Sequence, residues 1–360
     1  MASSKSVVAA KAGDRVRWVD IAKGIAIICV VIGHTVPHGP LRSAIFSFHL
    51  PVFFVLSGYT THLRPVSQIA GSLMKRLVVP YVLLVVACDV FILGLFQDRW
   101  IGIGPAAQQI IWASGVKVGD VPAAGAPWFL MCLFMARLVF IEVQRRLERV
   151  GVKPAWQGVG WLVTVYAAAL LQRSHVWLPF SLDLVPMASF LMWCGYQSKG
   201  IDLSRLCRPA PFLAVAIIWA LGVKLSDYEM ATRVFLPFIP AVTTALVGTL
   251  MVSVFSCLLD RHLEIPSRAL GWCGRESMAI YCVHALDGGV LGAIVAGLGY
   301  AGATWAWALN CLFRVCIDVA VAFACNKVKS RVAAGGMRRL FNAPKVVSHH
   351  DEVAKTNVKK

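Results

Sequence analysis

The chain has 360 residues, of which 58% are hydrophobic and 15% are charged, and its mean hydropathy is +0.70. A soluble protein of this length needs more charge to cover its surface, so these values exclude an ordinary soluble enzyme and indicate a membrane protein. Apolar stretches, each long enough for a helix to cross a hydrocarbon core of roughly 30 Å, predict about ten spans. They cover residues 18–37, 45–62, 77–97, 127–141, 157–172, 179–197, 211–225, 234–258, 276–297 and 303–326.

The unbroken character of these stretches predicts an all-α transmembrane bundle, because the strands of a membrane β-barrel alternate apolar and polar residues. Lys23 and His34 interrupt the first stretch and no small-residue cleavage site follows, so we expect a retained span and not a signal peptide. The predicted domains are a basic N-terminus at 1–17, a transmembrane domain at 18–326 and a basic, disordered tail at 327–360.

The distribution of positive charge predicts the orientation. Most of the 35 Lys and Arg residues fall in segments that share one side of the bilayer if the N-terminus is cytoplasmic. The positive-inside rule then places both termini in the cytoplasm and the protein in the inner, cytoplasmic membrane. More than half of the net charge of +17 lies in the two ends, where it suits an anionic lipid leaflet. The sequence has no basic stripe with interleaved aromatic residues, so we expect no nucleic-acid partner.

The eleven cysteines occur singly, without a C-x-x-C pair and without a Cys/His cluster of metal-ligand spacing. Most lie inside predicted spans, where a thiol packs as a small apolar group. We therefore expect no disulfide, no bound metal and no bound cofactor.

Ionisable side chains inside a span are costly, so each requires a partner or a function. The predicted spans contain Lys23, His34, His49, Asp89, Arg137, Asp183, His284, Asp287, Arg314 and Asp318. Arg314 and Asp318 are four residues apart, which predicts an ion pair between them and excludes both from the site. Asp89 and Arg137 offer no geometric argument for a function.

Lys23 and His34 lie eleven residues apart, close to three helical turns, so both belong to one face of the first span, roughly 16 Å apart along its axis. An ammonium at the cytoplasmic end can meet an anionic donor, and a histidine in the outer half can take a proton from a hydroxyl near neutral pH. The alternative is two unrelated polar residues at the helix ends, with Lys23 extended toward the interface.

The second span adds a histidine within the phrase FHLPVFFVLSGY at 48–59. Pro51 lacks an amide hydrogen and can bend the helix beside His49. The short loop before this span places His49 at nearly the depth of His34. Ser57, next to a glycine, fits a small-residue packing patch equally well.

Three later residues are weaker candidates, because each alone is more often structural. Trp128 opens the fourth span at the outer interface, where tryptophan commonly anchors a helix. Asp183, early in the sixth span, can orient a histidine as a neighbouring carboxylate. His284 falls near the middle of the ninth span.

Together these motifs resemble the acyltransferase-3 family of membrane proteins, and within it the branch of the fucose O-acetylases. Its members have Arg or Lys, ten residues and then His in the first span, matched by WVDIAKGIAIICVVIGH at 18–34. A phrase like F-H-x-P-x-F-F-x-x-S-G follows, matched at 48–58. Three further motifs are matched by KRLVVPY at 75–81, WFL at 128–130 and GRESMAIYCVH at 274–284.

The resemblance implies transfer of an acyl group, most often acetyl from cytoplasmic acetyl-CoA, to a hydroxyl of a carbohydrate or lipid-linked glycan at the outer face. His34 is then the catalytic base, and Lys23 and Arg76 hold the phosphates of the donor. His49 or Tyr59 stabilises the charge that develops on the thioester oxygen. A covalent acyl-histidine route stays open.

Two other functions also stay open at this point. Intramembrane His, Asp and Arg line the pathways of transporters and exporters of small polar or glycan substrates. The sequence has no internal repeat and no paired Gly/Pro-broken spans in corresponding halves, which disfavours a transporter. The third function is a membrane sensor or resistance module, which in some members of the family is fused to an amino-acid racemase.

Overall fold

A computed structural model describes residues 16–341, except 91–93, 95–99, 175, 288–293, 295, 296 and 298–304. Most of the predicted N-terminal domain, the end of the predicted tail and parts of the predicted spans 77–97 and 276–297 therefore lie outside the described residues. The chain divides into two compact units, Met1–Val319 and Ala320–Lys360. The site described below lies within the first unit.

Most of the described residues are helical, which confirms the predicted all-α class. The α-helices are α1 (Arg17–Gly33), α2 (Pro40–Phe46), α3 (His49–Tyr59), α4 (Val66–Leu73), α5 (Val79–Ala87), α6 (Ile103–Trp112), α7 (Trp128–Val150), α8 (Pro154–Arg173), α9 (Val185–Gln197), α10 (Pro209–Leu225), α11 (Phe238–His262), α12 (Glu264–Arg275), α13 (Ser277–Asp287) and α15 (Ala306–Phe341). A π-helical turn, Met74–Val78, joins α4 to α5, and shorter 3-10 turns occupy Pro179–Leu184, Ser198–Gly200 and Leu203–Arg205.

Four helical stretches are long and apolar enough to cross a membrane: Pro40–Tyr59, Val66–Val90, Phe238–His262 and Ala306–Val332. α10 is equally apolar in character but shorter. Several such helices in one chain make it a multi-pass membrane protein. The number of ten spans and the cytoplasmic position of both termini stay predictions.

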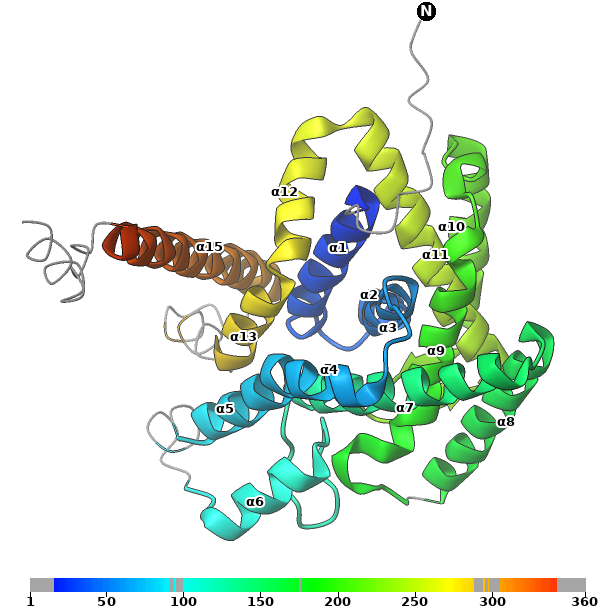
Figure 1. The fold of residues 1–360 in the computed structure, drawn as a ribbon, viewed down its shortest axis with the longest axis horizontal. Coiled ribbons are helices and arrows are strands. Elements are labelled where there is room, and N and C mark those ends of the chain that lie inside the picture. The colour runs from blue at the N-terminus through cyan, green and yellow to red at the C-terminus, as the bar shows by residue number, and fades with distance from the viewer. Residues whose placement is uncertain are drawn as a thin grey trace, which may run out of the picture. The chain divides into compact units, whose positions relative to one another are not determined.

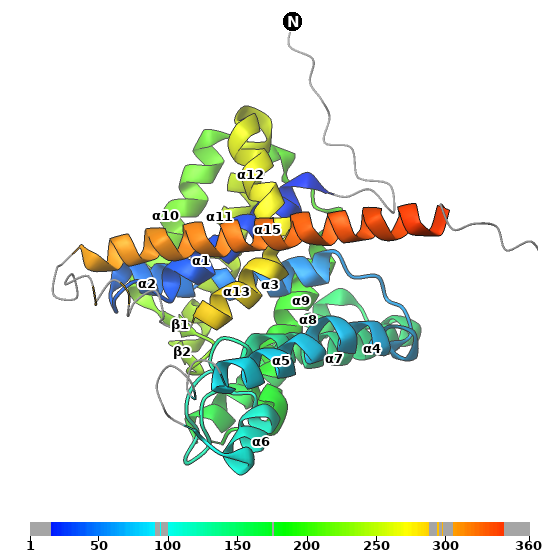
Figure 2. The same ribbon diagram turned by 90° about the vertical axis from the view of Figure 1, so that its left-hand side faces the viewer.

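A short β-hairpin differs from the predicted elements. β1 (Asp227–Glu229) pairs with β2 (Val234–Leu236) in antiparallel register, so the predicted beginning of a span at residue 234 is wrong. Pro237 follows β2 and has no amide hydrogen for a longer ladder, and α11 begins at the next residue. The hairpin lies beside α2 (Figure 2), where Arg42 Nη2 is 2.9 Å from Glu229 Oε1.

The charged segment before the predicted ninth span is also a helix, α12, which lies alongside α1 (Figure 1). Two glycines allow this close contact. A methyl group at Gly24 would overlap the carbonyl of Leu270, and one at Gly274 would overlap the carbonyl of Asp20. Because the two backbones touch, α13, which follows α12, is held along the second half of α1.

A second pair of glycines brings α3 against α9. A methyl group at Gly58 would overlap the backbone of Met192, and one at Gly195 would overlap the carbonyl of Val55. The small-residue packing predicted for this part of the second span is therefore confirmed for Gly58. α3 also shares a buried core with α1 and α11, so α1 is held between α3, α11 and α12.

Candidate active site

A pocket of about 270 Å³ lies among α1, α3, α7 and the α12–α13 pair. On α1 its wall consists of Asp20, Lys23, Ile27 and Val30. Their spacing of three and four residues places them on one helical face. The face that the sequence assigns to Lys23 and His34 therefore lines this pocket as far as Val30, one turn before His34.

The pocket is polar at the end where α1 begins. Lys23, Arg137 and Arg275 contribute positive charge, with Asp20 beside them. Arg137 is half-buried, and its Nε has no hydrogen-bond partner among the described residues. Arg76 is exposed and does not line the pocket, but it interacts electrostatically with Arg137. Several guanidinium and ammonium groups around one cavity suit a ligand that carries phosphates.

The opposite end of the pocket is apolar. Val30 lies there on α1, and the Phe53 and Phe129 rings of α3 and α7 lie 5.8 Å apart between centroids, tilted by 58°. Tyr281 of α13 closes the wall, with its ring 6.1 Å from that of Phe129. Such walls suit an uncharged, flexible arm of a ligand.

Three of the lining helices carry a histidine just beyond this apolar end. His34 follows the last lining residue of α1 by one turn, His284 does the same on α13, and His49 precedes the lining residue Leu50 on α3. The rings of His34 and His284 are 5.3 Å apart, and His34 also interacts electrostatically with His49. α1 and α3 therefore bring their histidines to the same end, as the short connecting loop predicts.

The three histidines differ in accessibility. The side chain of His34 is exposed, whereas His49 and His284 are only 2% and 3% exposed. His49 Nδ1 lies 2.9 Å from the carbonyl oxygen of Ile45, which accepts a hydrogen bond from it. Of the three residues, His34 is the one with an exposed surface.

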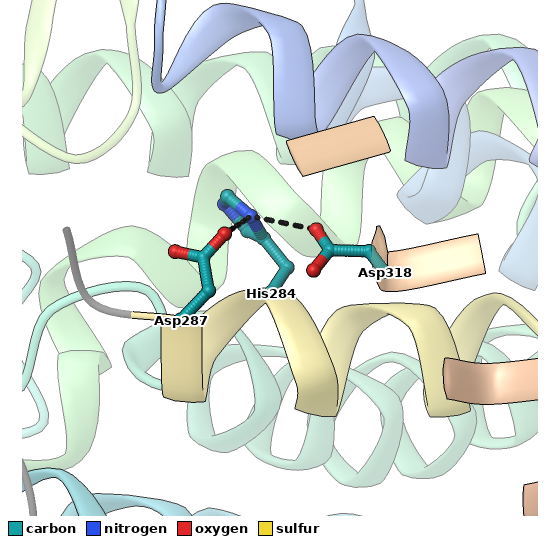
Figure 3. Close-up of side chains that lie close together, drawn as sticks. All are labelled: His284, Asp287 and Asp318. Atoms are coloured by element: carbon teal, nitrogen blue, oxygen red, sulfur yellow. Dashed lines mark ion pairs between the residues drawn. The ribbon is translucent and has the colours of Figure 1, made fainter. Parts of the chain in front are cut away.

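His284 is surrounded by charged groups from α13 and α15. Its Nδ1 lies 3.3 Å from Asp318 Oδ2 and 3.7 Å from Asp287 Oδ2, and Figure 3 shows both carboxylates directed at this edge of the ring. Arg314 donates to both carboxylate oxygens of Asp287, with Nε 2.5 Å from Oδ2. Arg314 Nη1 also lies 3.3 Å from the hydroxyl of Thr35, the residue after His34. We call His284, Asp287, Arg314 and Asp318 the acid–histidine cluster.

This cluster corrects one prediction. Arg314 and Asp318 do not pair with each other, although their spacing on one helix permits it. The carboxylate of Asp287 on α13 offers Arg314 two oxygens at once, the arrangement a guanidinium prefers, while Asp318 faces His284. The two residues that the spacing argument excluded from the site therefore lie beside it.

The ligand atoms of His284, Asp287 and Asp318 lie within 4.8 Å of one another, a spacing that also suits a metal ion. A metal ion needs a free carboxylate oxygen as a ligand, but the guanidinium of Arg314 already pairs with both oxygens of Asp287. The charges of this cluster therefore fit a protonated His284 imidazole better than a bound metal ion. All eleven cysteines are free thiols.

Among the remaining predicted residues, Ser57 lines the pocket and Tyr59 does not. Ser57 is buried, and its hydroxyl has no hydrogen-bond partner among the described residues. Tyr59 lies ten residues from His49 at the other end of α3, where its ring meets that of Trp18 edge-on at 5.3 Å. It lines a separate apolar pocket, so the structure does not bring Tyr59 to the histidines.

Trp128 and Asp183 also lie away from the histidines. Asp183 Oδ2 accepts a hydrogen bond from Arg233 Nε at 2.9 Å, and both side chains are almost fully buried. The guanidinium of Arg233 stacks on Trp177 at 3.9 Å and approaches the ring of Trp128 at 6.0 Å. The carboxylates that face a histidine are those of Asp287 and Asp318 instead.

The sequence contained signals for two residues that our predictions left out. Arg137 follows Leu130 by seven residues and Leu133 by four, so helical spacing places it on the pocket face of the WFL motif. Arg275 is part of the GRES phrase that precedes His284. Neither spacing distinguishes a ligand-binding arginine from one that extends to the membrane surface. Arg137 and Arg275 are therefore identified as pocket residues by their positions in the fold.

The helices and the pocket define a multi-pass membrane protein in which one cavity has a cationic end and an apolar end, with a group of histidines just beyond the apolar end. A family model described as an acyltransferase domain matches residues 16–325. The chain therefore belongs to the acyltransferase-3 family and is a membrane acyltransferase, which requires an acyl donor and an acceptor. No curated protein and no solved structure shows a significant match.

Proposed function

We propose that this acyltransferase moves an acetyl group from acetyl-CoA to a hydroxyl of a cell-surface carbohydrate or glycolipid, and that it does so in the inner, cytoplasmic membrane. The observation that carries the proposal is the pocket that has Lys23, Arg137 and Arg275 at one end and stops at Val30, one helical turn before His34, at the other. A donor with phosphates at one end and an uncharged thioester at the other matches the cationic and apolar ends of this pocket.

In this proposal the donor phosphates bind Lys23, Arg137 and Arg275, and Arg76 adds positive charge beside Arg137. The charge distribution of the chain predicts that this end faces the cytoplasm, where acetyl-CoA is made. The distance along α1 from Lys23 to His34, roughly 16 Å, suits an extended pantetheine arm. The apolar wall around Phe129 then contacts the uncharged arm and the thioester.

His34 is the proposed general base, because it is an exposed residue one helical turn beyond the pocket and an imidazole can accept a proton near neutral pH. It takes the proton from the acceptor hydroxyl while the oxygen forms a bond to the thioester carbon. The carbon–sulfur bond then breaks, and the proton passes from His34 to the departing sulfur. The products are an acetyl ester and free CoA thiol.

His49 supports the site but is a poor donor to the reacting oxygen. Its Nδ1 hydrogen is used on the carbonyl of Ile45, so the neutral ring presents a lone pair at Nε2. The ring of Phe46 contacts both His49 and His34, at 4.8 and 6.0 Å between centroids. We therefore assign His49 to holding Phe46 and His34 in place.

The acceptor class and the acetyl group rest on the resemblance to fucose O-acetylases. The exposed position of His34 supports them, because a bulky glycan can approach an exposed imidazole but not a buried one. A hydroxyl also fits as the acceptor, because it must lose its proton when its oxygen attacks the thioester.

The test uses the full-length protein in nanodiscs with acetyl-CoA carrying a radioactive acetyl group and a glycan fraction from the envelope of the producing cells. Alkali-labile label in the glycan measures O-acetylation. We expect the wild type to transfer label and the His34→Ala variant to lose it by about 10²- to 10⁴-fold, the usual contribution of a general base. His38→Ala is the matched control, since His38 is an exposed histidine in the following loop and lies outside the pocket.

Full transfer by a well-folded His34→Ala variant would remove His34 from the mechanism. A transporter predicts a different result, namely label that crosses a sealed proteoliposome while the thioester stays intact. Measuring free CoA thiol in the same reaction separates the two functions.

A further inference from the structure

Among the described residues, the acid–histidine cluster has one carboxylate more than its arginine can pair with, and a proton on His284 would balance this charge. Arg314 and Asp287 form a bidentate pair, so their charges cancel. Asp318 is fully buried, and neither of its oxygens has a hydrogen bond of good geometry within the described residues. The nearest nitrogen is His284 Nδ1, at 3.3 Å. A buried carboxylate without a positive partner is unfavourable in a membrane, so a protonated ring at His284 is the arrangement that balances the cluster.

The cluster is also oriented toward the proposed base. Nδ1 of His284 faces the two carboxylates in Figure 3, which leaves Nε2 at the opposite edge of the ring. The ring of His34 lies 5.3 Å away. Arg314 reaches the same place by a second route, through its hydrogen bond to the hydroxyl of Thr35. The cluster therefore holds both His284 and the end of α1 that carries His34.

The proposed chemistry lacks a group that stabilises the developing negative charge. Tyr59 lies at the wrong end of α3, and His49 uses its hydrogen on a carbonyl. His284 lies one turn beyond Tyr281, which lines the apolar end of the pocket, so it is at the depth of the thioester in the proposed donor position. A positive group at this depth acts where catalysis of acyl transfer needs it most.

We propose that His284 is a second catalytic histidine, a permanently protonated ring that stabilises the oxyanion of the tetrahedral intermediate, and that Asp318 is the positioning residue that keeps it protonated and oriented. The inference rests on the proposed function. His34 accepts the hydroxyl proton and passes it to sulfur, as above. His284 donates a hydrogen bond to the thioester oxygen while negative charge resides there and keeps its own proton throughout.

The experiment compares Asp318→Asn and Asp318→Glu in the nanodisc assay with acetyl-CoA and the envelope glycan fraction. Asparagine keeps the size of the side chain but removes its charge. We expect Asp318→Asn to lower kcat by about 10²- to 10³-fold, the usual effect of losing a group that stabilises an oxyanion. The KM for acetyl-CoA should stay within about twofold, because the donor phosphates bind at the other end of the pocket. Asp318→Glu should recover part of kcat.

The matched control is Asp89→Asn. Asp89 is another buried acid in an apolar helical stretch, Val66–Val90, and within the part of the chain that the structure describes it interacts with Gln109 but with no histidine. We expect its kcat to match that of the wild type. His284→Gln provides a second variant in case Asp318→Asn fails to accumulate, and we expect the same loss of kcat with the same KM.

Several results would overturn the inference. One is a kcat of Asp318→Asn or His284→Gln equal to that of the wild type, and another is a loss that appears only in KM or only in protein yield. Activation of the wild type by Zn²⁺, with loss of activity in a chelator, would mean that the cluster binds a metal instead. If His34→Ala abolishes transfer but Asp318→Asn does not, only this inference fails. If the wild type transfers no acetyl group, the proposed function itself fails.

Discussion

Two buried groups of charged side chains in this protein both contain aspartate and arginine, but only one of them contains a histidine and a second acid. Asp183 and Arg233 form a pair of one acid and one base, and aromatic rings flank the guanidinium. The acid–histidine cluster has two acids, one arginine and a histidine, and it contacts the exposed His34. The charges of Asp183 and Arg233 balance each other, so we call them the closed pair and assign it a structural role. A cluster with unbalanced charge beside an exposed histidine is suited to catalysis instead.

The largest effect on stability should come from breaking the closed pair. We expect Asp183→Ala to destabilise the protein by about 3–5 kcal/mol, because it leaves the guanidinium of Arg233 buried without its partner. Yield and thermal unfolding in detergent measure this loss. Replacing both partners at once, in Asp183→Leu with Arg233→Met, should recover most of the stability. A stable, fully active Asp183→Ala variant would show that the pair is not structural.

The cationic end of the pocket should respond differently, by losing donor affinity. Arg137→Gln removes one charged contact to a phosphate, so we expect the KM for acetyl-CoA to rise about 10- to 100-fold with kcat nearly unchanged. Arg173 is an exposed arginine of α8 outside this pocket, and Arg173→Gln is the control. Equal KM values for the two variants would place the donor phosphates elsewhere.

Ser57 permits a smaller and more specific test. Its buried hydroxyl belongs to a residue that lines the pocket and has no hydrogen-bond partner among the residues described, a state that costs about 1–3 kcal/mol when no ligand is bound. We expect Ser57→Ala to raise the melting temperature of the ligand-free protein slightly and to reduce the further rise on adding CoA. An unchanged response to CoA would mean that Ser57 does not meet the donor.

The smallest effect should arise outside the pocket, where Arg17 and Arg268 donate to Glu264 and hold the pKa of this exposed carboxyl below its usual range. A lowered pKa means that Glu264 stabilises the fold above its unfolded pKa, about 4.3, and that this contribution is lost as the pH falls through the lower folded pKa. The melting temperature of Glu264→Gln should therefore lie slightly below that of the wild type at pH 7. The gap should close in acid and shrink in high salt. A gap that persists at pH 3 would contradict this assignment.

The sequence predicts the parts of the site that depend on spacing within one helix or across a short loop. Lys23 and the lining residues of α1 share a face because the helical period is 3.6, and the short connection between α1 and α3, which contains α2, brings His34 and His49 to one end. Asp287 lies three residues after His284, so its contact with the histidine was also within reach of a local argument.

The sequence does not predict contacts between distant segments. Asp318 contacts His284 because α15 lies beside α13 at this point. For the same reason Arg314 pairs with Asp287 of α13 and not with Asp318 of its own helix. The contact of α1 with α12 depends on two glycines that no periodicity connects. Tyr59 belongs to the same sequence motif as His49 but lies at the other end of α3. Ten helical residues span roughly 15 Å, so closeness in the motif does not mean closeness in space.

The measurement that tests the central claim most directly is a structure of the nanodisc-embedded protein by electron cryomicroscopy with a non-reactive thioether analogue of acetyl-CoA. We predict that its phosphates contact Lys23, Arg137 and Arg275 and that its thioether lies at the apolar end, within reach of His34 and His284. An analogue bound outside this pocket, or one whose acyl end points away from both histidines, would contradict the account.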